Sequence, residues 1–173
     1  RNDRRTLGGF RWEHAFDSAT TGQVQLVVDD RNINQPTSTT SAIGDYLSYN
    51  LISGVSHRIV IAGLPTLGYL GAFWNYLPVD GKTYNVAPGG DAKLGLLQSE
   101  QTGSTTNVGV RARQEVRVAD DVSVVAGATV ERTLLDGAQR GYIYNTSGNL
   151  IRTNFVTADR EMTNVAPELG LIY

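Results

Sequence analysis

The sequence predicts an all-β fold: an antiparallel up-and-down meander that forms part of a transmembrane β-barrel. The 173 residues include 19 glycines and no long stretch in which apolar residues recur at helical spacing. Several long segments alternate between apolar and polar residues, as strands do. The links between these segments are of two kinds, short and long, which is typical of a barrel with tight turns at one rim and long loops at the other.

The first two predicted strands are Thr6–Phe16 and Gly22–Val28. In the first, aromatic side chains occupy even-numbered positions, whereas Arg11 and Glu13 occupy odd-numbered ones. The segment Asp17–Thr21 between the strands has the composition of a turn. The two strands are therefore expected to pair as a hairpin with matched apolar and polar faces.

The region from Arg31 to Thr105 is predicted to be a long external loop with hairpins of its own, including one around Gly63-Leu64-Pro65. A connection of this length in a compact structure is usually functional. Its aromatic side chains and one arginine could hold an anionic chelate through stacking and charge. These candidate ligand contacts are Tyr46, Tyr49, Arg58, Trp74, Tyr76 and Tyr84. Packing within extended hairpins is the alternative role, and the one that this composition favours.

The clearest alternation spans Thr106–Val118 and Val122–Leu134, which are joined by a tight turn at Ala119-Asp120-Asp121. In the first segment the even-numbered side chains from 108 to 118 are apolar except Gln114, and four odd-numbered ones are charged. The second segment repeats the pattern. Together they predict a long hairpin with one apolar and one charged face.

The last part of the chain is predicted to be a second external loop, Asp136–Arg160, followed by a fifth strand, Asn164–Tyr173. Arg140 and Tyr144 are the candidate ligand contacts in this loop. Its Ser147-Gly148-Asn149 run is typical of a hairpin tip.

Charged residues avoid the apolar positions of these strands, which indicates that the apolar face meets lipid. An arginine or lysine that faces lipid at the midplane costs about 2–4 kcal/mol. Asp30 and Arg132 are exceptions that should lie near the outer boundary, whereas Gln114 is an exception without an explanation. The charged face is expected to line a lumen on the concave side of the sheet. The lumen-facing residues are Arg11, Glu13, Arg111, Arg113, Glu115, Arg117, Glu131 and Glu168.

Composition excludes several classes of function. The formal net charge of −2 argues against a nucleic-acid partner. With no cysteine and only two histidines, the chain offers no familiar catalytic constellation and no metal site. We therefore expect it not to be an enzyme and to bind no cofactor directly.

Two other functional classes fit the same alternation. One is a passive porin or an adhesin barrel, and the other is a soluble carbohydrate-binding β-sandwich. A sandwich would bury Val108, Val124 and Leu169 against a second sheet. A passive porin would conduct ions without a plug.

Several runs resemble the barrel of TonB-dependent outer-membrane receptors of the siderophore type. They are Asp29–Pro36, Thr83–Gly90, Val130–Thr133 and the final Asn164–Tyr173, which has the Pro-x-x-Gly-apolar-x-Tyr pattern. The resemblance spans almost the whole chain. The energy-coupling box, the plug domain and the terminal aromatic strand of that family are missing from this sequence.

The resemblance implies that residues 1–173 are an internal segment of a 22-stranded barrel. It implies active uptake of a ferric siderophore or a similarly bulky ligand across the bacterial outer membrane. The implied partners are outer-membrane lipid, the plug domain of the same full-length chain, and the TonB energy-transducing complex. The absence of an initiator methionine fits the expectation of an internal segment.

Overall fold

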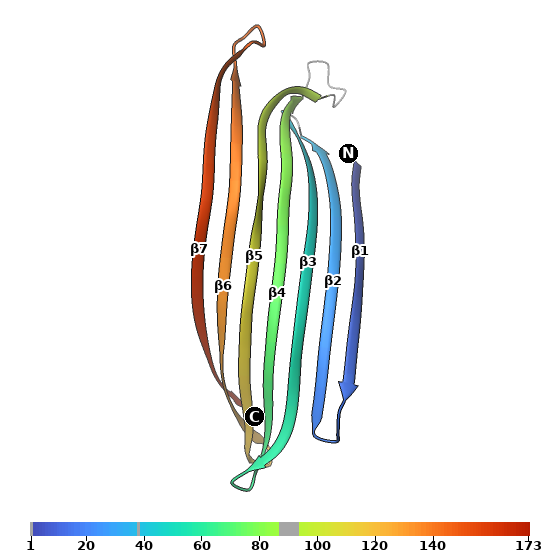
Figure 1. Ribbon diagram of the computed structural model, residues 1–173, viewed down its shortest axis with the longest axis vertical. Helices are drawn as coiled ribbons and strands as arrows, with labels where there is room; N and C mark the ends of the chain where they lie inside the picture. Colours follow the sequence, from blue (N-terminus) through green and yellow to red (C-terminus); the bar gives the residue numbers. More distant parts are fainter. Residues whose placement is uncertain (1, 38, 87–93) are drawn as a thin grey trace.

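The chain forms one antiparallel sheet of seven strands in sequence order (Figure 1). The computed structural model describes residues 2–37, 39–86 and 94–173. All described residues in regular structure belong to strands, so the predicted all-β, up-and-down meander is confirmed. The strands are β1 (Asn2–Ala15), β2 (Thr20–Pro36), β3 (Thr40–Ile61), β4 (Leu64–Val86), β5 (Leu94–Ala119), β6 (Val122–Tyr144) and β7 (Leu150–Ile172).

The strands are 14 to 26 residues long, far above the usual five or six residues of strands in globular proteins. Each one pairs only with its neighbours in sequence. The register is nearly continuous, with irregularities near Thr83–Val86 and at the ends of β5 and β6. Directly opposite residues point to the same side of a sheet, so this register fixes which side chains share a face.

The expectation of a long loop from Arg31 to Thr105 is wrong, because this region contains the end of β2, β3, β4 and the beginning of β5. The sheet therefore has seven long strands where the sequence predicted five. Polar and apolar residues alternate poorly here, because both faces of the upper sheet carry polar side chains. The predicted hairpin near Gly63 is confirmed. Ala62 and Gly63 both have positive φ (52° and 81°), as a two-residue turn between twisted strands requires.

The second expected loop, Asp136–Arg160, is also wrong as a loop, since β6 continues to Tyr144 and β7 starts at Leu150. Only residues 145–149 connect them. The Asn145 side-chain oxygen accepts hydrogen bonds from the backbone N–H groups of Ser147 and Asn149 (3.0 and 2.8 Å). Gly148 has a φ of 80°, in agreement with the predicted hairpin tip.

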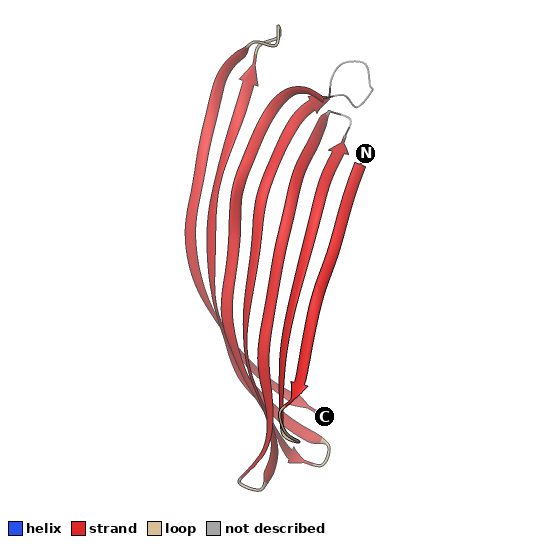
Figure 2. Cartoon of the chain, turned by 45° about the vertical axis from the view of Figure 1, so that its right-hand side comes forward, coloured by secondary structure: helices blue, strands red, loops and turns tan. Residues whose placement is uncertain are grey.

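The sheet is a single curved layer that does not close on itself (Figure 2). Its accessible surface is 11687 Å². A compact monomer of this mass would expose roughly 8,300 Å². Among the described residues Val125 is the only buried large hydrophobic side chain, while Val108 and Leu169 are 44% and 84% exposed. The described residues form no second sheet, so the packing that a sandwich needs is not present.

Candidate functional site

The sheet has two chemically different faces, and the register shows which residues lie on each. One row of opposed residues runs from Arg11 through Gln25, Ile52, Phe73, Gly109 and Glu131 to Asn164. We call this side the polar face. The eight residues expected to face a lumen all lie on it: Arg11, Glu13, Arg111, Arg113, Glu115, Arg117, Glu131 and Glu168.

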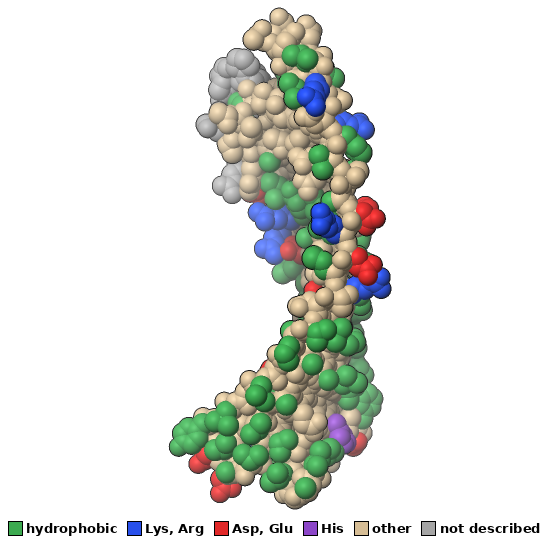
Figure 3. All heavy atoms as spheres, turned by 90° about the vertical axis from the view of Figure 1, so that its left-hand side faces the viewer, with side chains coloured by type: hydrophobic (Ala, Val, Ile, Leu, Met, Phe, Trp, Pro, Cys, Tyr) green, Lys and Arg blue, Asp and Glu red, His purple; other side chains and the backbone are tan. Residues whose placement is uncertain are grey.

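The polar face is the inner side of the bend. A Cβ atom added at Gly103, Gly109 or Gly127 on this face would lie within 2.7 Å of a backbone oxygen of an adjacent strand, although one at Gly141 would meet nothing within 4 Å. Concave surfaces crowd their side chains, and in the middle of β6 the polar-face residues are accordingly less exposed than their neighbours. Seen from the β7 edge, the sheet bends toward a side that carries charged groups at mid-height (Figure 3).

Ion pairs cross the polar face over β6. Arg111 donates from Nη2 to Oε2 of Glu168 (2.8 Å), and Arg113 lies 3.7 Å from both Glu168 and Glu115. Gly127 stands between Arg113 and Glu168 in the register, so the absence of a side chain there leaves room for the pair to form. The Nε of Arg113 is buried without a hydrogen-bond partner.

The opposite side, which we call the apolar face, carries two aromatic clusters. The first lies beside the short β1–β2 turn, where the His14 ring is 5.6 Å from Trp12 and 4.9 Å from Phe16. The second consists of Tyr49, Trp74 and Tyr76, with ring centroids 6.0 to 6.4 Å apart.

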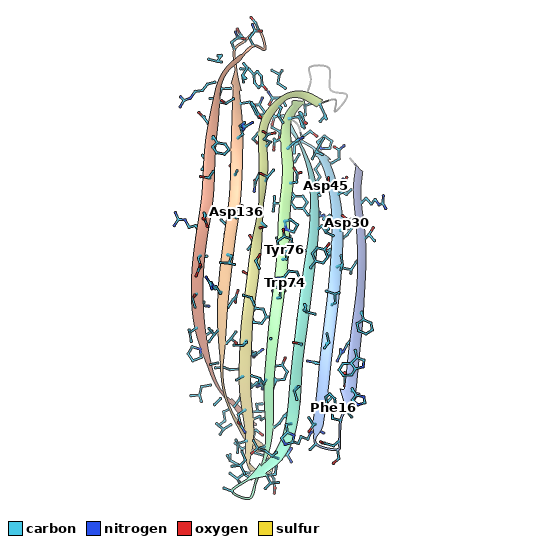
Figure 4. The ribbon with its side chains drawn as sticks, viewed as in Figure 1. Phe16, Asp30, Asp45, Trp74, Tyr76 and Asp136 are labelled. Atoms are coloured by element: carbon cyan, nitrogen blue, oxygen red, sulfur yellow. The ribbon has the colours of Figure 1, made fainter. Side chains whose placement is uncertain are left out.

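The two aromatic clusters mark the upper and lower ends of one stretch of the strands. Tyr49 lies opposite Val28, which lies opposite Gly8, eight residues from Phe16. At about 3.3 Å per residue these outermost members are roughly 26 Å apart, whereas the nearest members, Trp74 and Trp12, are only two residues apart in register, or about 7 Å. Phe16 lies near the lower end of the sheet, and Asp30, Asp45 and Asp136 lie above Trp74 and Tyr76 (Figure 4).

Two of the sequence exceptions on the apolar face are Arg132 and Gln114. Arg132 lies in the row of Trp74 and donates to Glu161 across 2.7 Å, so its charge is paired. Gln114 is linked through Gly68 and His57 to Thr20, at the lower end of β2. This row is level with the β1–β2 turn, but on β5 to β7 the apolar face continues below it at Val116, Val124 and Leu171, so the position of Gln114 has no structural explanation.

The structure does not bring the eight candidate ligand contacts together. Three of them form the upper aromatic cluster on the apolar face: Tyr49, Trp74 and Tyr76. Tyr46 and Arg58 are on the polar face but far apart, since Tyr46 pairs with Arg31 and Arg58 pairs with the backbone of Ala19 beside the lower turn.

The remaining candidates, Tyr84, Arg140 and Tyr144, lie toward the upper ends of their strands. The Arg140 guanidinium lies 5.7 Å from the centroid of the Phe155 ring and 3.4 Å from Oε1 of Glu100. The Tyr142 hydroxyl also donates to Glu100 (2.7 Å). Ligand contact at these residues stays a prediction.

One polar cluster was not expected from the sequence. Thr20 Oγ1 lies 2.8 Å from Nδ1 of His57 and 3.1 Å from Oδ2 of Asp17. Hydrogen bonds from the backbone N–H groups of Ala19 and Thr20 hold the pKa of Asp17 below its usual value, and the Thr20 hydroxyl and His57 act in the same direction. The sequence signal was an Asp three residues before a Thr, but the contact with His57 depends on the register of β2 and β3.

No known family model matches the sequence, and no curated protein matches it. The part of the chain that the structure describes contains no helix long and apolar enough to cross a membrane. Within residues 2–37, 39–86 and 94–173, no three acidic or histidine side chains gather in a way that could hold a metal ion.

Proposed function

We propose that this chain is a wall segment of a bacterial outer-membrane β-barrel of the TonB-dependent receptor type. The apolar face would contact lipid, and the polar face would line the lumen. The observation that carries the proposal is the separation of faces across the sheet: all eight of the charges named above lie on the inner side, and the outer side bears an apolar band with aromatic residues at its two ends, Phe16 below and Tyr49 with Tyr76 above.

The dimensions of this band fit a membrane. Outer-membrane barrels carry an apolar band about 25 Å tall with aromatic girdles at both interfaces, and tilted strands shorten the roughly 26 Å found here. The described residues in the centre of the band carry no unpaired charge. Two adjacent register rows there contain Val55 with Leu70, and Val110 with Val130 and Val165.

Lipid also accounts for the large exposed apolar surface. Monomeric soluble proteins rarely expose contiguous apolar patches larger than a few hundred Å². Here the exposed large hydrophobic residues include Leu70, Val110, Val165, Leu169 and Leu171, all on the apolar face. In a bilayer this surface would contact lipid hydrocarbon, which takes the place of a protein core.

The proposed cargo is a ferric siderophore or a comparably bulky ligand, and the proposed partners are a plug domain and the TonB energy-transducing complex. These assignments rest on the sequence resemblance. A passive porin or adhesin shares the same wall architecture, so the experiment has to separate active uptake from diffusion.

The test uses the natural full-length polypeptide in a bacterial host. We expect it to fractionate with the outer membrane and to migrate differently in gels before and after heating, as folded barrels do. We expect ferric-siderophore uptake that stops when the proton gradient is collapsed. Steady ion conductance in planar bilayers together with gradient-independent uptake would favour the porin, and recovery in the soluble fraction would refute the membrane assignment.

A further inference from the structure

The lower part of the polar face contains a hollow of about 540 Å³ that the proposed wall does not require. Its polar lining residues include Arg58 from β3, Glu115 and Arg117 from β5, and Ser123 from β6. The rest of the lining is mostly apolar and comes from β3 and β4: Ile59, Val60, Pro65, Thr66 and Leu67. Arg58 and Arg117 come from strands that lie on either side of β4, which places their backbones about 10 Å apart across the sheet. Two guanidinium groups therefore border one depression on the concave side.

These two arginines have no counter-ions. Among the described residues, neither Arg58 nor Arg117 has a carboxylate within 4 Å, and both are exposed. Among the described residues that line the hollow, Glu115 alone carries a carboxylate, and it lies 3.7 Å from Arg113. Asp120 and Asp121 of the β5–β6 turn do not line the hollow. The hollow thus has spare positive charge and spare N–H donors.

A second hollow of about 290 Å³ adjoins the first through two shared lining residues, Leu67 and Glu115. It is lined by Arg111 and Arg113, with the hydroxyl groups of Ser56 and Tyr69 nearby. The Tyr69 ring lies over Gly54 and Gly71, where an added Cβ would meet it below 3 Å, so the aromatic wall is held in place. Arg111 and Arg113 are both paired with Glu168 (2.8 and 3.7 Å), so the charge without a counter-ion comes from Arg58 and Arg117 of the first hollow.

Together the two hollows contain a column of arginines along β5. Arg111, Arg113 and Arg117 are separated by two and four residues on one face, or roughly 7 and 13 Å. Guanidinium groups bind carboxylate and phosphate oxygens in a bidentate manner, and a planar fork is better suited to this than a point charge. Hydroxyl groups beside the arginines supply further neutral hydrogen bonds.

From this geometry we propose that the lower inner wall binds small oxyanions, and that the cargo of the barrel presents a carboxylate or phosphate group to it. The inference deepens the proposed function. The statement that the bound anion belongs to a transported ligand rests on that function. Two small hollows fit a small molecule, because ligand pockets are typically about 300–1,000 Å³. A covering protein surface would need an interface of about 800 Å² per partner.

The test measures binding of citrate and of inorganic phosphate to the purified full-length polypeptide by titration calorimetry, with glucose as a neutral probe. We expect both anions to bind and glucose not to bind. Arg58→Gln and Arg117→Gln should each weaken anion binding at least tenfold, since each removes a charge-assisted contact. The anion affinity of Arg58→Lys should lie between those of the unsubstituted protein and Arg58→Gln, because lysine keeps the charge but lacks the planar guanidinium that binds an oxyanion in a bidentate manner. Arg132→Gln, on the apolar face, is the matched control and should leave the affinity unchanged.

The proposal is overturned if the unsubstituted protein binds neither anion, or binds glucose equally well. It is also overturned if the Gln variants keep the affinity of the unsubstituted protein. If a Gln variant fails to fold, Arg58→Lys and Arg117→Lys decide the matter, and unchanged affinity in both refutes it. Binding of an acidic peptide without binding of citrate or phosphate would also refute the small-molecule site.

The outcome can be separated from that of the proposed function. Anion binding by a protein that does not reach the outer membrane would remove the transport role and leave the oxyanion site. An outer-membrane protein that takes up ligand but shows no effect of Arg58 or Arg117 would keep the transport role and remove the site.

Discussion

A pair of adjacent substitutions on β7 tests whether the apolar face meets lipid. Val165 lies on the apolar face, in the row of Val130, Val110 and Trp12, which runs midway between the row of Tyr76 and Phe16. Asn164 is its neighbour in sequence, lies on the polar face, and pairs with Glu131. Both side chains are exposed, with Val165 at 61%, so simple burial within the sheet does not distinguish them.

The expected effects differ because the two faces meet different solvents. Val165→Arg places a guanidinium near the bilayer midplane, at a cost of about 2–4 kcal/mol. This corresponds to a change of roughly 30-fold to nearly 1,000-fold in the unfolding equilibrium constant, at about 1.4 kcal/mol for each factor of ten. Asn164→Arg places the same group beside Glu131 in the lumen and should change the free energy of unfolding by no more than about 0.5 kcal/mol.

The measurement is reversible denaturant unfolding of the full-length polypeptide in phospholipid vesicles, followed by tryptophan fluorescence. A lower midpoint for Val165→Arg with an unchanged midpoint for Asn164→Arg supports lipid contact. Equal shifts for the two variants would refute the assignment of faces. A larger loss for Asn164→Arg would mean that the polar side faces the hydrocarbon.

Three further predictions concern separate parts of the sheet. Gly127→Ala should destabilise the protein by about 1–3 kcal/mol, because the new Cβ would lie 2.7 Å from the Ala112 oxygen; thermal unfolding measures this, and Gly8→Ala, which meets nothing within 4 Å, is the neutral control. The Asp17 carboxylate should stabilise the β1–β2 turn above its unfolded pKa of about 3.9 and lose that contribution as the pH falls through its lower folded pKa. Asp17→Asn should flatten the dependence of stability on pH below about 4, and an unchanged slope would contradict this role. Phe16 and Tyr76 mark the two ends of the apolar band, so a tryptophan placed at either position, in a variant without Trp12 and Trp74, should be quenched more strongly by lipids brominated near the headgroup than by lipids brominated near the bilayer centre; stronger quenching from the centre would contradict the boundary positions.

The sequence predicted correctly which residues share a face of the sheet where one face is consistently apolar and the other is not. Along the lower half of β5 one face is mostly apolar and the other is charged, and along the lower half of β6 one face is apolar and the other carries mainly small residues, so a period of two is visible. Above the aromatic clusters the outer face also carries polar groups, as the opposed Asp45 and Asp80 show. There the alternation disappears, and β3, β4 and the upper parts of β5 to β7 were mistaken for loops.

The contacts between charged residues could not be predicted in the same way. The alternation of side chains along each strand places Arg111 and Glu168 on one face, but it does not predict that they meet across β6 at 2.8 Å. That contact needs the register of two hairpins and the missing side chain of Gly127. The hollow beside Arg58 likewise depends on β3 and β4 being wall strands, which the sequence did not reveal.

Sequential pairing has a consequence for how such a wall is made. Every strand has its main contacts with the strands just before and just after it, so each hairpin can form when its second strand has been synthesised. No strand has to wait for a distant segment of the described chain. A register error in one hairpin would, however, be passed on to every later strand and would turn inner side chains outward. The two-residue turn at Ala62 and Gly63 fixes the register of β3 and β4, and it therefore helps to decide which side chains of the later strands face inward.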